Sequence, residues 1–139
     1  MATTSKSTLL YGNMDGDKTD VSAASQFIEK LLLAVDSIHK VHLMTTGPGS
    51  FAAHEALGET YSALEDGLDG LAESYMGCQY VGLEFKGVDV SNYCAEVRKI
   101  YDYVEANRMM MGTESHIQNK VDEILDGLAR SLFKLDRLA

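Results

Sequence analysis

Apolar residues recur every three to four positions in four long stretches of this chain. Side chains spaced in this way lie on one face of an α-helix. The pattern predicts helices over about residues 20–44, 50–77, 90–109 and 114–138. We therefore predict an all-α protein.

Each predicted helix has one apolar face, and these faces are expected to form the core. The expected inward residues are Ala24, Phe27, Ile28, Leu31, Val35, Ile38 and His42 in the first helix, Leu57, Tyr61, Leu64, Leu68, Leu71 and Tyr75 in the second, Tyr93, Val97, Ile100, Tyr101 and Val104 in the third, and Ile117, Val121, Ile124, Leu128, Leu132 and Leu135 in the fourth. Gly58, Gly67 and Gly70 interrupt the second helix, and each costs about 1 kcal/mol relative to alanine. We expect a neighbour to approach this helix closely.

The connections between the predicted helices are short, long and short. A Gly-Pro-Gly turn at 47–49 separates the first two helices, and Ser50 could cap the second. Gly112 separates the last two helices, with Thr113 as a possible cap. The long connection, residues 77–90, would let the second and third helices run parallel. This order predicts a ferritin-like four-helix bundle with one long crossover between helices two and three.

The length of 139 residues fits one domain. We expect the bundle to span residues 20–139. Residues 1–19 are rich in Ser, Thr, Gly and Asp, and they predict an extended N-terminal arm.

The charge balance argues against nucleic acid as a partner. Acidic residues outnumber basic ones 21 to 12, for a formal net charge of −9. DNA-binding proteins depend largely on Lys and Arg to neutralise phosphates, so we expect no DNA binding. An acidic surface can instead gather metal cations.

The chain shows neither a signal peptide nor a membrane-length apolar segment, and its two cysteines form no metal motif, so we expect a cytoplasmic protein with no membrane partner.

Two histidines and two acids are spaced in a way that suggests metal chemistry. His42 and His54 are twelve residues apart, across the Gly-Pro turn. Asp69 follows fifteen residues later, and Glu73 lies four further on. Neutral imidazoles and carboxylates together suit Fe(II), Mn(II) and Zn(II). At about 100° per residue, the polar positions of the second helix, with Glu65 among them, fall beside its apolar face, which suits a site shared with another chain.

Plainer interpretations of the same residues remain open. His42 lies on an apolar face and could be a hydrogen-bonded core histidine. The charges at Glu65, Asp66 and Asp69 could form a solvated helix face. His39, one turn before His42, could be an additional ligand, a supporting residue or simply an exposed side chain, and Glu65 is a further candidate of this kind.

Residues 39–75 resemble the Dps family, the mini-ferritins related to starvation-induced DNA-binding proteins. The resemblance is carried by a histidine at the end of the first helix, a Gly-Pro turn followed by Phe, a second histidine twelve positions after the first, and the acids that follow. The matching positions here are His42, Gly47-Pro48, Phe51, His54, Asp69 and Glu73, with the sequence LDGLAE at 68–73.

The resemblance implies a dodecameric cage built from dimers. His42 and His54 of one chain would face Asp69 and Glu73 of its mate. Iron would bind there as Fe(II), be oxidised to Fe(III) by peroxide or oxygen, and be stored as a mineral in the cavity, with manganese or zinc as alternative metals. The protein would then be a ferroxidase and an iron store.

The chain also departs from the family pattern. Gly58 stands where the family usually has an acid, and Leu43 stands where it usually has Trp. The Lys-rich tail that binds DNA in some members is missing, and the chain is shorter than most members. Gly58 and the short chain favour a second hypothesis, in which a cellular or phage-encoded ferritin-like protein has a structural or interaction role and a degenerate metal site.

Overall fold

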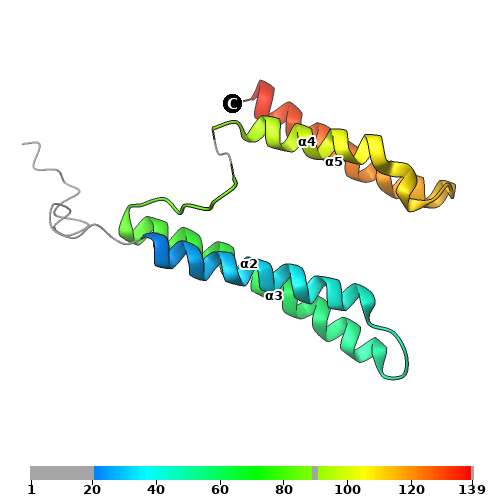
Figure 1. Cartoon of the computed structure of the whole chain (residues 1–139), viewed down its shortest axis with the longest axis horizontal. Coiled ribbons are helices and arrows are strands. Elements are labelled where there is room, and N and C mark those ends of the chain that lie inside the picture. The colour runs from blue at the N-terminus through cyan, green and yellow to red at the C-terminus, as the bar shows by residue number, and fades with distance from the viewer. Residues whose placement is uncertain (1–20, 89–90, 139) are drawn as a thin grey trace, which may run out of the picture. The chain divides into compact units, whose positions relative to one another are not determined.

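The structure is a computed structural model, which describes residues 21–88 and 91–138, and over these residues its regular secondary structure is helical, with turns and loops between the helices. Its helices are α2 (Val21–Met44), α3 (Ser50–Gln79), α4 (Tyr93–Asn107) and α5 (Ser115–Arg137), with a short 3-10 helix η1 (Arg108–Met111) after α4 (Figure 1). The all-α prediction is confirmed. The chain divides into two compact units, residues 1–86 and 87–139. The expected arm at 1–19 lies outside the described residues.

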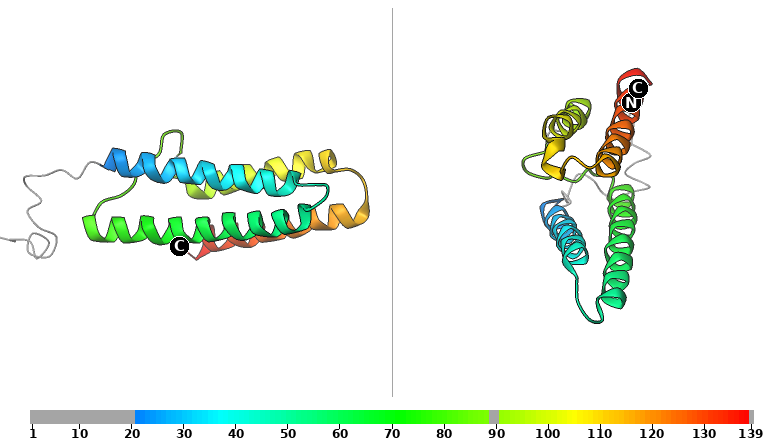
Figure 2. Two further views of the ribbon diagram at one scale, coloured as in Figure 1. Left: turned by 90° about the horizontal axis from the view of Figure 1, so that it is seen from below. Right: turned by 90° about the vertical axis from the view of Figure 1, so that its right-hand side faces the viewer.

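The first unit is a hairpin of α2 and α3. The two helices pack against each other, and Figure 2 shows them joined by a tight turn. Ile28 and Leu68 are its buried apolar residues. At the turn, Gly47 and Gly49 have φ values of 95° and 76°, in the left-handed region that favours glycine. Gly49, not Ser50, is the N-cap of α3, so the predicted cap was one residue too late.

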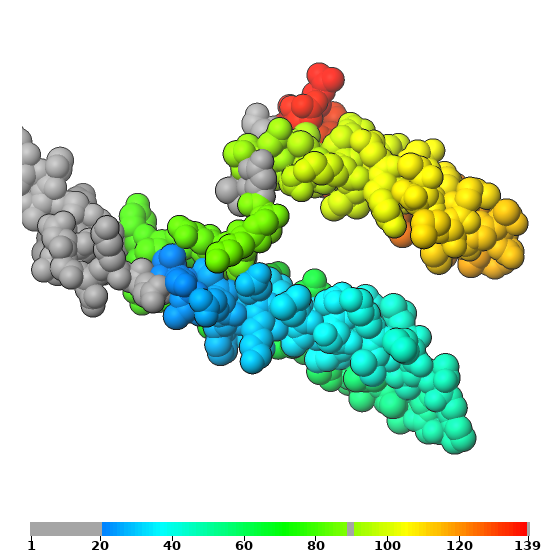
Figure 3. All heavy atoms as spheres, in the orientation of Figure 1, coloured from blue at the N-terminus to red at the C-terminus, as the bar shows by residue number. Residues whose placement is uncertain are grey.

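The chain returns over the start of α2 after α3 ends. Tyr80, with φ of 56°, closes α3, and its N–H donates to the Met76 carbonyl. The Glu84 N–H donates to the Ser25 hydroxyl oxygen at 3.0 Å. Figure 3 shows this stretch lying against the first turns of α2. The long connection therefore begins on the first hairpin, whereas a crossover along a whole helix stays a prediction.

Replacing Ser25 by alanine is expected to release this stretch. Ser25 is only 4% exposed, so loss of its hydroxyl leaves the Glu84 N–H without its acceptor, at a cost of about 1 kcal/mol. Amide hydrogen exchange at Glu84 should quicken about fivefold, the equivalent of that free energy. The exposed Ser37 on the same helix provides a matched control, Ser37→Ala. Unchanged Glu84 exchange in the Ser25 variant would refute the role of the hydroxyl.

The second unit is a hairpin of α4, η1 and α5. Val121, Leu125 and Leu132 of α5 are buried in it. The Asn92 side chain caps α4 by accepting from the Ala95 N–H at 3.1 Å. The N-cap of α5 is Glu114 rather than the predicted Thr113, and its side chain makes no capping hydrogen bond.

Arg108 and Gln118 tie η1 to the first turns of α5. The Arg108 Nε donates to Gln118 Oε1 at 2.7 Å, and the Gln118 amide nitrogen donates to the carbonyls of Arg108 and Gly112 at 3.0 and 2.6 Å. Arg108 also pairs with Asp122, whose hydrogen bond is the main cause of a raised pKa for the guanidinium. These bonds fix the turn between α4 and α5.

Several residues predicted to face inward are exposed. They are Phe27, Leu71, Tyr93, Ile100 and Ile124. Each hairpin contains two packed helices, and two helices cover a narrower apolar strip than four do. Packing of the two hairpins into one bundle stays a prediction. No helix within 21–88 and 91–138 is long and apolar enough to cross a membrane.

Candidate functional site

Three histidines and a tyrosine gather where the end of α2 meets the start of α3. The rings of His42 and His54 are stacked, with centres 3.7 Å apart and planes inclined by 25°. His39 stacks on Tyr61, with ring centres 4.1 Å apart. His39 and His54 are exposed, and His42 and Tyr61 are half-buried.

His42 and His54 exchange hydrogen bonds between side chain and backbone. The His42 Nδ1 lies 2.7 Å from the His54 carbonyl oxygen, and the His54 Nδ1 lies 3.0 Å from the His42 carbonyl oxygen. A carbonyl oxygen can only accept, so each Nδ1 carries the proton and donates. In the neutral imidazoles, the free lone pair is then on Nε2. Metal-binding histidines commonly have this arrangement, with the second ring nitrogen donating to an oxygen.

The helix termini explain one of these bonds. Because α2 ends at Met44, the His42 carbonyl lies in the last turn, where carbonyls have no partner in the helix. The His54 ring donates to this carbonyl. The two bonds together tie the last turn of α2 to the first turns of α3.

Gly58 makes room for the bond that His42 Nδ1 donates to the His54 carbonyl. Gly58 lies one turn after His54 on α3, on the side of the helix that the His42 ring approaches. A Cβ atom at Gly58 would lie 3.2 Å from His42 Cε1 and 3.4 Å from His42 Nδ1. The sequence predicts close approach at three glycines of this helix, and the structure shows it at Gly58, whereas a Cβ at Gly67 or Gly70 would meet nothing within 4 Å.

His39 and Tyr61 extend the group along both helices. The ring centres of His39 and His42 lie 6.0 Å apart with planes inclined by 54°, and Tyr61 meets the His42 ring edge-on at 5.4 Å. Sequence reasoning assigned Tyr61 to the core and missed its contact with His39. The positions of His39 and Tyr61 could have indicated this contact. His39 lies three residues before His42, and Tyr61 lies three residues after Gly58. Because His42 and Gly58 lie close together, the residues three positions further along each helix should also meet.

The predicted acidic ligands lie elsewhere on α3. Asp69 and Glu73 follow His54 by fifteen and nineteen residues, which correspond to about 22 and 28 Å along a helix. Glu65 is also well removed, at about 16 Å. All three acidic residues are exposed, which agrees with their predicted position beside the apolar face of the helix. Within the described part of the chain, no three His, Cys, Asp or Glu side chains are grouped so that they could hold a metal ion. The predicted histidines and acids therefore do not form one site on this hairpin, and a site shared with a second chain stays a prediction.

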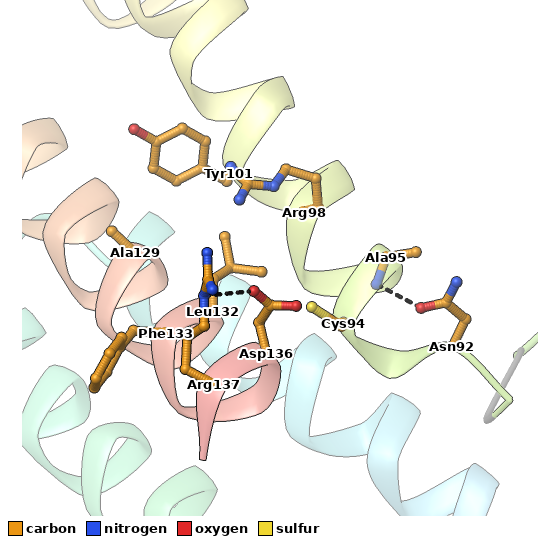
Figure 4. A pocket seen from close by; sticks show the side chains of 10 residues that line it. All are labelled: Asn92, Cys94, Ala95, Arg98, Tyr101, Ala129, Leu132, Phe133, Asp136 and Arg137. Carbon is orange, nitrogen blue, oxygen red and sulfur yellow. Dashed lines mark hydrogen bonds and ion pairs between the residues drawn. The ribbon is translucent and has the colours of Figure 1, made fainter. Parts of the chain in front are cut away.

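The second hairpin contains a separate open cavity of about 630 Å³, between the start of α4 and the end of α5 (Figure 4). The Arg98 guanidinium lies 5.4 Å from the centre of the Tyr101 ring. Asp136 pairs with Arg137 at 3.1 Å, so two of the three charged groups in the lining neutralise each other. No motif in the sequence predicted this cavity.

Comparison with known proteins places the chain in a family without indicating its chemistry. No curated protein and no solved structure matches it. One family model matches residues 42–135, which is more than half of the chain and includes both His42 and His54. The chain therefore belongs to DUF5856, a family of unknown function.

Proposed function

We propose that this protein is a Dps-like iron-binding protein that oxidises and stores iron at a site shared between two copies of the chain. The observation that supports it best is the pair of reciprocal hydrogen bonds between His42 and His54. These bonds hold both Nδ1 atoms as donors and leave Nε2 lone pairs at a partly exposed position. The two hairpins would pack as a ferritin-like bundle with one crossover, which would cover their exposed apolar faces.

The donor set fits a transition metal. Imidazole nitrogens and carboxylate oxygens suit Fe(II), Mn(II) and Zn(II), and carboxylates also offset the charge that iron gains on oxidation. Asp69 and Glu73 are exposed and one turn apart on α3, so both can reach a neighbouring molecule. In a two-fold dimer every contact occurs twice. A mate running antiparallel would therefore bring its acids to these histidines and give two identical sites.

In this proposal Fe(II) is the substrate, and peroxide or oxygen is the oxidant. The imidazoles of one chain and the acids Asp69 and Glu73 of its mate would hold the ion, with Glu65 as a nearby additional acid. The dimers would assemble into a dodecameric cage. The net charge of −9 disfavours binding to DNA phosphates, so iron storage rather than DNA coating would be the role.

Rapid oxidation of Fe(II) tests the proposal. Adding Fe(II) and then hydrogen peroxide to the full chain should give ferric absorbance faster than buffer alone. Asp69→Asn should slow the reaction about tenfold or more, because it removes a charged ligand. Asp66→Asn is the matched control, since Asp66 is an exposed aspartate of the same helix. A wild-type rate equal to that of buffer would defeat the proposal.

A second candidate function is a structural or interaction role without metal. It is favoured by the same histidine pair, because each imidazole already bonds the backbone of the other helix, and by Gly58, where the Dps pattern has an acid. In this alternative the pair only fastens α2 to α3. Native mass spectrometry with metal analysis separates the two, since an assembly that remains metal-free after exposure to Fe(II) supports the structural role.

A further inference from the structure

We propose that the imidazole ligands of the shared metal site are His39 and His42, and that His54 is a positioning residue. This assignment rests on the proposed function only because it takes the acidic ligands from a second copy of the chain. The two histidines belong to one chain. They differ from the pair that the Dps resemblance implies, which is His42 and His54.

The stacking of His42 on His54 prevents these two rings from holding one ion. The lone pair of an imidazole nitrogen lies in the plane of its ring. A metal–nitrogen bond is about 2.1 Å long, whereas the two rings lie face to face, with centres 3.7 Å apart and planes inclined by only 25°. Two imidazole planes that are so nearly parallel do not meet at a point within one metal–nitrogen bond length of both rings. An ion in the plane of one ring would therefore lie far out of the plane of the other.

His39 and His42 are spaced as two ligands of one ion can be. They are three residues apart on α2, so they share a helix face. A ring bound through nitrogen has its centre about 3.2 Å from the ion, so two such rings can have centres up to about 6.4 Å apart. The observed separation is 6.0 Å, with planes inclined by 54°. An ion between these two rings is compatible with both values.

The neighbours of the pair hold each ring in place. Tyr61 lies flat against His39, with planes inclined by 15°. The His54 carbonyl accepts from His42 Nδ1 and leaves the His42 Nε2 lone pair for the ion. Gly58, by lacking a side chain, lets the His42 ring lie against α3 and also removes the acid that the Dps pattern has there. His39 would then supply the ligand that this acid provides in the pattern.

Cobalt(II) binding to the full-length chain tests the assignment, because its visible absorption reports ligand geometry without iron oxidation. His39→Gln should weaken Co(II) affinity about tenfold or more, as loss of a ligand requires. His54→Phe keeps a flat ring against His42 but has no ligand nitrogen, and it should retain affinity within about threefold, which is less than 1 kcal/mol. His116→Gln is the control, since His116 is exposed on α5 in the other hairpin.

The reverse order, with His54→Phe losing affinity and His39→Gln keeping it, would overturn the assignment. So would wild-type protein that binds no Co(II). Histidine side-chain NMR of the wild type with Zn(II) provides a check that no variant can disturb, because the ligand nitrogens shift on binding. Zn(II)-dependent shifts at residues 39 and 42 support the assignment, and shifts at 42 and 54 refute it. Co(II) binding without iron oxidation would reject the proposed function and leave the ligand pair standing.

Discussion

Replacing Leu68 by alanine is expected to lower the free energy of unfolding by about 2–4 kcal/mol. Leu68 is 3% exposed, and it is the most deeply buried apolar residue of the described chain. Its removal loses the transfer free energy of three carbon atoms and leaves a cavity between two helices that are held by their own packing. Urea denaturation followed by circular dichroism measures the change.

Leu71 on the same helix provides the matched comparison. The apolar pattern predicts both leucines in the core, but Leu71 is 46% exposed. Leu71→Ala should therefore cost less than about 1.5 kcal/mol, since roughly half of its surface is already in contact with water. Equal losses at the two positions would contradict the burial in the hairpin and would indicate that another surface covers Leu71.

The helices could be predicted from the sequence because their apolar residues recur with a long, regular period. Every predicted helix is present, and the first, second and fourth begin and end within two residues of the predicted limits. The termini were less predictable. Ser50 and Thr113 are good capping residues, but Gly49 and Glu114 occupy the cap positions. The backbone angles of the preceding turn decide which residue begins the helix. The amino-acid composition of the turn does not determine those angles.

The residues of the core were harder to predict than the helices. Ile124 and Leu125 are adjacent and both apolar, and the pattern selects Ile124, whereas the structure buries Leu125. A helix face about 100° wide can turn by one residue without changing its period. Which residue becomes buried depends on the direction from which the partner helix packs, and the sequence of one helix alone does not contain that direction.

The histidines of the candidate site were predictable as a group, but Tyr61 and the contacts among the rings were not. A tight turn between two helices brings the last turn of one close to the first turns of the other, so the proximity of His42 and His54 follows from their spacing. Their stacking does not follow, because it depends on ring rotation and on two specific backbone carbonyls. The spacing also suggests that both histidines bind one ion, and the planes of the rings argue against it.

Replacing Gly58 by valine is expected to lower the free energy of unfolding by about 1–3 kcal/mol, the usual cost of overfilling a packed site. The new Cβ would lie 3.2 Å from His42 Cε1, and the two methyl groups would crowd the ring further. The His42 ring would have to shift away from position 58, which strains its hydrogen bond of 2.7 Å to the His54 carbonyl and its stack on His54. Urea denaturation measures the stability, and the His42 Nδ1–H signal in NMR reports the bond.

Gly67→Val is the matched control, because a Cβ at Gly67 meets nothing within 4 Å on the same helix. That variant should change stability by no more than about 0.5 kcal/mol. Equal stability of the two variants would show that His42 moves aside without cost. A clear difference would mean that the close approach of the His42 ring favours glycine at position 58. An acid there, as the Dps resemblance would lead one to expect, would meet the same steric limit.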